Sequence, residues 1–167
     1  MPNATQLFTI GHSNQEWSSF VQTLNRFSIP LVVDVRSRPH SSRHPQFSQP
    51  EFEGALREAM LKYLFLGEEL GGRPADAKAY RDDGMVDYRA RRQSYGFRAG
   101  IERVLQELEA GPLVLMCAEE DPLTCHRFLM ICPELIASGI TPQHIRKGSI
   151  IETQSEAEDR LLVDHGF

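Results

Sequence analysis

The stretch from Cys117 to Arg127, CAEEDPLTCHR, holds the densest set of reactive side chains in the sequence. Two cysteines stand eight residues apart, and His126 and Arg127 directly follow the second one. A helix that begins near Asp121 or Thr124 would offer unpaired backbone N–H groups and the positive end of its dipole, and the two basic side chains would add donors that suit phosphate or carboxylate. The pattern therefore predicts an anion pocket.

The same stretch fits two further roles. A cysteine at a helix N-terminus tends to have a lowered pKa, so Cys117 is the candidate nucleophile, and Glu119 is a candidate general base or acid if burial raises its pKa. Alternatively, Cys117, Cys125 and His126 would supply three zinc ligands, with His12 or water as the fourth, and the zinc would activate water in a metal-dependent hydrolase. The spacing lacks the paired cysteines of structural zinc sites, so the leading interpretation assigns no metal ligand. It does not specify a cofactor.

Two earlier segments deliver polar residues in similar positions. His12 and Ser13 follow the apolar run 7–10, and Asp34 and Arg36 lie at the end of the apolar, β-branched run 31–35. In open α/β sheets ligands bind beyond the carboxyl ends of the strands, so we expect these residues to meet at one rim. The expected catalytic residues are Cys117, Glu119, Asp34 and His12, and the expected ligand-binding residues are Arg36, Ser13, Cys125, His126 and Arg127.

Several of these residues also have a purely structural interpretation. Asp34 would be satisfied by pairing with Arg36 in the interior. Ser13 begins an S-x-x-E capping box that predicts a helix start. Cys132 lies in an apolar stretch and fits a core position.

The elements that must position these residues alternate along the chain. Apolar runs at 7–10, 31–35, 63–66 and 113–116 predict strands, and helical spacing of apolar residues predicts helices over 17–27, 52–63, 97–108 and 123–138. Capping patterns at 48–51, 141–142 and 153–156 predict further helix starts, while Pro133 is unfavourable inside a helix. The alternation predicts an α/β fold with a mainly parallel sheet flanked by helices on both faces, a Rossmann-like three-layer arrangement.

The length of 167 residues suits one domain, which we expect to span residues 1–167. The segment 36–50 is rich in Ser, Pro, Arg and His and predicts a long loop, and the segment from about 73 to 96 has little periodicity. This second segment interleaves arginines with tyrosines and predicts an irregular insertion.

The net charge of −5 excludes a wholly basic coat for nucleic acid but leaves a local basic patch open. A non-enzymatic nucleic-acid-binding or interaction module is therefore a further alternative. The three cysteines form no CxxC pair, and the sequence has neither a signal peptide nor an apolar run of membrane-spanning length, so we expect a cytoplasmic protein without a membrane partner. The contact set of the module alternative would be Arg38, Arg43, Arg89, Arg91, Arg92 and Arg98.

Several well-defined enzyme motifs are missing from the sequence. It contains no G-x-S-x-G elbow, no G-x-x-x-x-G-K-[ST] loop and no G-x-G-x-x-G fingerprint, and neither Cys117 nor Cys125 is followed at the sixth position by arginine, as in a cysteine phosphatase loop. The leading hypothesis is a pocket that binds or processes a phosphorylated ligand, a nucleotide or a nucleic-acid end.

Four motifs in order resemble the domain-of-unknown-function family 488: TIGHS at 9–13, DVR at 34–36 with Pro39 and Ser41, LGEELGG at 66–72, and the stretch 117–127. The resemblance covers about residues 7–145. It implies a small bacterial or archaeal α/β protein, and it names a fold group without an established reaction. The family's shared polar positions carry over to His12, Ser13, Asp34, Arg36, Cys117, Glu119, Cys125, His126 and Arg127.

Overall fold

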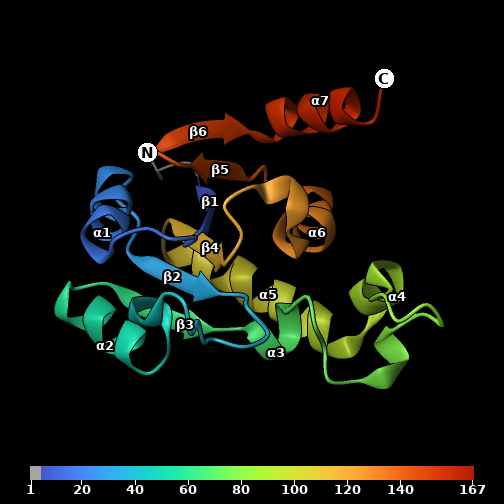
Figure 1. The fold of residues 1–167 in the computed structure, drawn as a ribbon, viewed down its shortest axis with the longest axis horizontal. Helices are drawn as coiled ribbons and strands as arrows, with labels where there is room; N and C mark the ends of the chain where they lie inside the picture. Colours follow the sequence, from blue (N-terminus) through green and yellow to red (C-terminus); the bar gives the residue numbers. More distant parts are fainter. Residues whose placement is uncertain (1–4) are drawn as a thin grey trace.

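The computed structural model describes residues 5–167, which form one six-stranded sheet with helices on both faces (Figure 1). The strand order is β3-β2-β4-β1-β5-β6, and all neighbours are parallel except β5 and β6. The predicted α/β fold with a mainly parallel sheet is confirmed. The strands are β1 (Leu7–Gly11), β2 (Leu31–Asp34), β3 (Lys62–Phe65), β4 (Leu113–Cys117), β5 (Gln143–Arg146) and β6 (Ile150–Thr153).

Alternating residues of the strands belong to two hydrophobic cores, one on each face of the sheet. In β2, Val32 packs toward the face covered by α1 (Trp17–Arg26) and α2 (Glu51–Glu58), whereas Val33 packs toward the other face. The near-continuous apolar runs of the parallel strands follow from this burial on both sides. The second face is covered by α3 (Gly67–Leu70), α5 (Tyr95–Ala110) and α6 (Cys132–Ala137), with α4 (Tyr88–Gln93) beside α5.

The connections create a crevice at the carboxyl ends of the central strands. The chain leaves β1 and β2 over the face of α1 and α2, but it leaves β4 over the face of α6. Because β4 lies between β1 and β2, the chain leaves β4 over the opposite face from both of its neighbours. Such a switch in direction is where open α/β sheets bind ligands.

Two of the predicted capping boxes are wrong. Ser13 has a positive φ of 47°, and α1 begins only at Trp17. The Oγ atom of Ser48 donates to the carbonyl of Ser41, and α2 begins at Glu51 without a side-chain cap. Ser13 is therefore part of the turn after β1, and Ser48 is part of the loop before α2. Neither residue caps a helix as the pattern predicts.

The chain after Thr141 departs from the predicted helix start for a tertiary reason. Residues 143–146 form β5, because Phe8, Thr9 and Ile10 of β1 offer an open edge for parallel pairing, and β6 then returns antiparallel to β5. The capping box at 153–156 is confirmed. Thr153 and Glu156 satisfy each other's backbone N–H groups at the start of α7 (Gln154–Asp164).

The predicted helix over 123–138 is divided into three pieces: a 3₁₀ turn at Pro122–Thr124, a π-helical turn at Arg127–Ile131, and α6. A continuous α-helix would require an N–H group at Pro133. The π-helical turn places this proline in the first turn of α6, where no such donor is needed.

The segment 73–96, predicted as irregular, contains a 3₁₀ turn at Ala77–Ala79, the whole of α4 and the start of α5. Arg91 of α4 is buried and donates to the carbonyls of Glu68 and Glu69, which fastens this segment to α3. The longest helix, α5, has 16 residues, and none of the helices within residues 5–167 is long and apolar enough to cross a membrane.

Candidate functional site

An open cleft of about 470 Å³ lies at the carboxyl ends of β2 and β4. An adjoining hollow shares Arg38, His40 and Ala118 with it and extends toward His12 and Ser13. The rim predicted from the strand ends is therefore a concave surface. The residues that line the main cleft are Arg36, Ser37, Arg38, His40, Gly72, Arg73, Tyr88, Cys117, Ala118, Glu119, Thr124 and His126.

The cleft is basic although the protein is acidic. Four arginines line the cleft and the hollow, Arg36, Arg38, Arg43 and Arg73, whereas Glu119 is the single carboxylate. Arg38 and Arg73 are exposed, and neither forms an ion pair with any carboxylate of residues 5–167. Their charges remain available to an anion.

Arg36 is held by an ion pair on the α1–α2 face of the sheet. Its Nε and Nη2 atoms donate to the two carboxylate oxygens of Asp34 at 2.9 and 2.8 Å, and Nη2 also donates to the carbonyl of Phe47. Asp34 is 0% exposed and accepts a further bond from Tyr63 Oη. Asp34 does not line the cleft, so the structure gives it the positioning role rather than the expected role of general base.

His12 occupies the same cluster as a neutral side chain. Its ring stacks on Phe47 with centroids 4.5 Å apart, and Nε2 accepts from Arg36 Nη1 because guanidinium only donates. Nδ1 is therefore protonated and donates to the carbonyl of Ser13. Burial lowers the pKa of His12 to about 4, so the ring is uncharged at neutral pH. Both ring nitrogens already have partners, which leaves no free position for catalysis or for the zinc ligand considered above.

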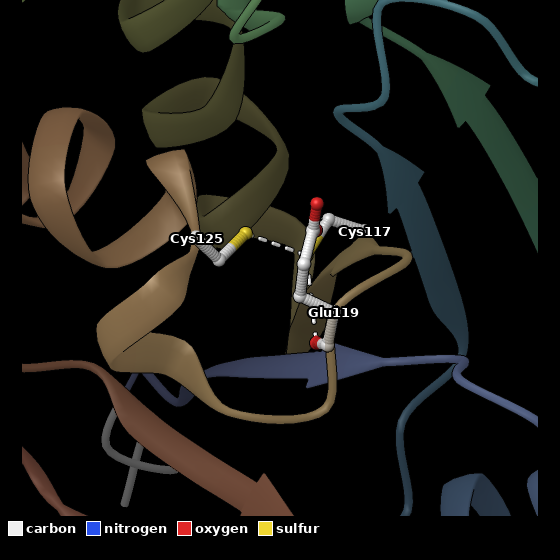
Figure 2. A group of neighbouring side chains, drawn as sticks. All are labelled: Cys117, Glu119 and Cys125. Atoms are coloured by element: carbon white, nitrogen blue, oxygen red, sulfur yellow. Dashed lines mark hydrogen bonds between the residues drawn. The ribbon is translucent and has the colours of Figure 1, made fainter.

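The two cysteines meet on the opposite face of the sheet. The Sγ atoms of Cys117 and Cys125 lie 2.7 Å apart, both side chains are buried, and both thiols are free (Figure 2). Burial raises the pKa of the Cys117 thiol well above its usual range, although the guanidinium of Arg127 opposes this. The structure thus corrects the expected low-pKa nucleophile.

Arg127 lies beneath the cleft and not on its surface. The side chain is 0% exposed and donates to Thr9 Oγ1, Cys117 Sγ and the carbonyls of Glu119 and Glu120. These bonds use four of its five N–H groups. The expected anion contact is therefore corrected: Arg127 positions the loop after β4.

Glu119 and His126 stand at the edge of the cleft. Burial acts to raise the pKa of Glu119, but its own backbone N–H and the thiols of Cys117 and Cys125 outweigh this and lower it. The expected upward shift is thus wrong in sign. His126 Nε2 lies 2.9 Å from the carbonyl oxygen of Val35, which links the loop after β4 to the end of β2.

The structure divides the predicted site residues into three groups. Arg36, Cys117, Glu119 and His126 line the cleft, and His12 and Ser13 line the adjoining hollow. Neither lining includes Asp34, Cys125 or Arg127, all of which are buried.

Sequence reasoning did not assign His40, Gly72, Arg73 or Tyr88 to the site. A signal existed at Gly72, at the end of the glycine-rich motif: a Cβ there would meet the His126 ring at 2.8 Å, so only glycine permits this approach. His40 belongs to the segment 36–50, and a signal was present there too, because the segment holds three arginines, two histidines and no acidic residue.

The predicted nucleic-acid contact set is dispersed. Arg38 and Arg43 lie at the cleft and its hollow, but Arg91 is buried and Arg92 pairs with Glu134 at 3.5 Å. Of the six arginines, Arg38 and Arg43 therefore lie at the concave surface, whereas Arg91 and Arg92 bind groups within the protein.

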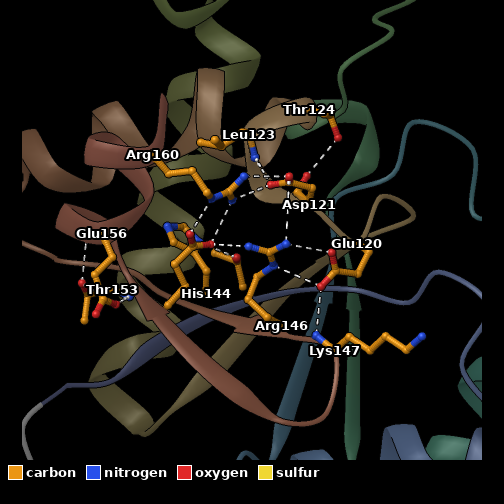
Figure 3. Close-up of polar contacts among 12 residues, drawn as sticks. Glu120, Asp121, Leu123, Thr124, His144, Arg146, Lys147, Thr153, Glu156 and Arg160 are labelled. Carbon is orange, nitrogen blue, oxygen red and sulfur yellow. Dashed lines mark hydrogen bonds and ion pairs between the residues drawn. The ribbon is translucent and has the colours of Figure 1, made fainter. Parts of the chain in front are cut away.

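A network of ion pairs fastens the loop after β4 to the C-terminal elements (Figure 3). Arg146 of β5 donates to both carboxylate oxygens of Glu120 at 3.0 Å, and Arg160 of α7 donates to both oxygens of Asp121. Glu152 of β6 bridges the two arginines. The loop after β4 is thus held by Arg127, which binds its backbone carbonyls, and by ion pairs with β5 and α7 that Glu152 of β6 links.

Comparison with known families identifies the chain. The profile described as Domain of unknown function DUF488 matches residues 16–131, which include the cleft and both cysteines of the site. Neither the curated proteins nor the solved structures contain a match to this chain. The match spans well over half of the 167 residues, so the chain belongs to the DUF488 family.

Proposed function

We propose that the cleft binds a phosphorylated ligand, a nucleotide or the phosphorylated end of a nucleic acid. The observation that carries the proposal is the set of unpaired arginines at the carboxyl ends of β2 and β4 in a protein with a net charge of −5. A cleft with one sign of charge concentrates ligands of the opposite sign.

The arginines have distinct tasks. Arg38 and Arg73 are exposed and would form charge-assisted hydrogen bonds with the phosphate oxygens. Arg36 is fixed by Asp34, and one of its five N–H groups, on Nη1, has no partner among the described residues. Arg36 would therefore act as a preorganised donor at the base of the cleft.

Tyr88 favours a nucleotide over inorganic phosphate. It lines the cleft together with Arg73, and its ring is half-buried. Aromatic rings of this kind stack on bases whatever their sequence. The volume of about 470 Å³ is within the range of small-molecule pockets.

Binding is better supported than covalent catalysis by cysteine. The raised pKa of Cys117 keeps the thiol protonated, and its Sγ already contacts Arg127 and Cys125. Glu119 is the one carboxylate of the cleft, and its lowered pKa keeps it ionised at neutral pH.

Calorimetric titration with a nucleoside monophosphate and with a 5′-phosphorylated oligonucleotide, in the presence of a chelator, tests the proposal. We expect Arg38→Ala and Arg73→Ala each to weaken binding about tenfold or more. Arg103→Ala should have no effect, because Arg103 pairs with Glu107 on α5 away from the cleft.

Salt separates the two ligand classes. Affinity for the oligonucleotide should decrease more steeply with salt than affinity for the mononucleotide, because more phosphates are neutralised. Wild-type protein that binds neither probe, or equal affinities in the Arg38, Arg73 and Arg103 variants, would rule out this function.

A further inference from the structure

We propose that Cys117, Cys125 and Glu119 bind a thiophilic divalent cation, with zinc the best match to the donors, and that His126 completes the site. The two Sγ atoms and a carboxylate oxygen of Glu119 all lie within 4.8 Å of one another (Figure 2). This inference does not rest on the phosphorylated ligand, although Cys117, Glu119 and His126 also line the cleft.

The donor set and its spacing suit a tetrahedral ion. Zinc accepts thiolate, imidazole and carboxylate ligands, and its bond lengths of about 2.0–2.3 Å place neighbouring donor atoms roughly 3.5–3.8 Å apart. The sulfurs of Cys117 and Cys125, at 2.7 Å, would separate by about 1 Å around a bound ion. Glu119 is exposed at the cleft, so its carboxylate is free to move to the distance that a bound ion requires.

The orientation of His126 supplies a separate argument. The carbonyl of Val35 only accepts, so Nε2, 2.9 Å away, carries the proton and donates. In the neutral ring this leaves Nδ1 with a lone pair, and Nδ1 lies 3.7 Å from Cys125 Sγ. A histidine whose second nitrogen donates to a backbone carbonyl is the usual arrangement around a metal-binding imidazole. The close approach of Gly72 to the ring fixes it in this place.

Charge balance points to the same site. Arg127 is 0% exposed, yet within residues 5–167 no carboxylate pairs with it. Buried charges are normally compensated. A divalent cation with two thiolates and one carboxylate carries one net negative charge, which the guanidinium of Arg127, in contact with Cys117 Sγ, would neutralise.

A disulfide accounts for fewer of these observations. It would involve the two sulfurs alone and would leave the placement of Glu119 and the tautomer of His126 without a purpose. It would also leave the guanidinium of Arg127 beside a neutral sulfur, without the negative charge that a metal-bound thiolate would supply. The metal site is therefore the inference that the geometry favours.

Elemental analysis of protein produced in zinc-supplemented medium and purified without a chelating column tests the site. We expect about one equivalent of zinc in the wild type, and a loss of most of it in Cys117→Ser and Cys125→Ser. Cys132→Ser is the matched control, because Cys132 is equally buried but lies in α6 outside the cluster. Cobalt loaded in place of zinc should give a thiolate charge-transfer band that the Cys125 variant lacks.

Glu119→Gln keeps the test informative if a cysteine variant fails to fold, because Glu119 is exposed. Its zinc affinity, measured by competition with a chelating dye, should decrease about 10- to 100-fold. Wild-type protein with less than about one-tenth of an equivalent of any transition metal would overturn the site. So would a Cys117–Cys125 disulfide found by mass spectrometry in freshly purified protein. Either result leaves nucleotide binding untouched, since that titration is made with chelator present.

Discussion

Arg36 donates a hydrogen bond from Nη1 to Nε2 of His12 across 3.2 Å, and this contact joins the end of β2 to the end of β1. These two strands are not neighbours, because β4 lies between them. The same guanidinium binds both oxygens of Asp34. One buried side chain therefore couples two strand ends and presents its remaining donor to the cleft.

Asp34→Asn should destabilise the protein by about 3–5 kcal/mol, because it leaves the buried guanidinium of Arg36 without its counter-charge. Tyr63→Phe is the matched control. It removes one neutral donor to Asp34 and should cost only about 1–2 kcal/mol. Urea unfolding measures both, and equal losses in the two variants would contradict the importance of the ion pair.

His12 should make stability dependent on pH between about 6.5 and 4. Its pKa is about 4 in the folded protein and 6.5 as a free side chain, so in this range the unfolded chain binds a proton that the folded protein does not. Stability must then fall as pH falls. Between pH 7 and pH 5 the wild type should lose about 2 kcal/mol more than His12→Gln, which lacks the titrating group.

The neighbours of His12 contribute to its lowered pKa together with burial. Arg36 and the ring of His44, 6.5 Å away, lower its pKa, while Asp34 raises it. Urea unfolding of both proteins at the two pH values gives the difference directly. Parallel losses in wild type and variant would show that His12 does not titrate as an isolated buried base.

Gly11→Ala should cost about 3 kcal/mol, because a Cβ at this position would lie 1.6 Å from the carbonyl oxygen of Glu119. Backbone atoms of the loop after β4 would have to move, and with them Glu119 itself. Gly54→Ala is the control within helix α2, where a Cβ meets nothing within 4 Å, and it should stabilise by about 0.5–1 kcal/mol. Thermal unfolding should therefore show shifts of opposite sign.

Arg160→Ala should lower stability by about 1 kcal/mol at low salt, because Arg160 joins Asp121 and Glu152 in one network. Arg160 lowers the pKa of Asp121 to about 2, so the variant should also raise that pKa, which NMR titration would detect. Arg103→Ala removes a simple surface pair within α5 and should cost at most about 0.5 kcal/mol.

High salt distinguishes a network effect from lost packing. The cost of Arg160→Ala should shrink as salt screens the half-exposed charges. A cost that does not change with salt would instead assign the contribution of Arg160 to packing of its aliphatic stem.

The sequence by itself determined four of the six strands, the class of fold and the rim that carries the site. Apolar β-branched runs such as 31–35 bury both of their sides, and this pattern has a single common solution, a parallel sheet between helices. Polar residues placed directly after such runs must then meet at the carboxyl edge, as Arg36, Cys117 and Glu119 do in the cleft.

Local patterns were less informative where long-range contacts compete with them. The capping box at Thr153 is confirmed because nothing else claims its side chain, whereas Ser48 is held by Ser41. The predicted helix start at Thr141 is replaced by a strand because β1 offers an unpaired edge. The backbone hydrogen bonds between β1 and β5, which are 135 residues apart in the sequence, outweigh the local preference for a helix start at Thr141.

Only the tertiary structure decided on which side of the sheet each polar residue lies and which of them are free. Asp34 and Arg127 resemble site residues in the sequence, but each is fully buried. Asp34 is satisfied by Arg36 and Tyr63, and Arg127 by Thr9, Cys117 and two carbonyls. The reason is geometric. The place of Asp34 in β2 directs its side chain toward Tyr63 and Arg36, and the π-helical turn that begins at Arg127 directs that side chain toward Thr9 and Cys117. Neither direction can be read from the order of residues alone.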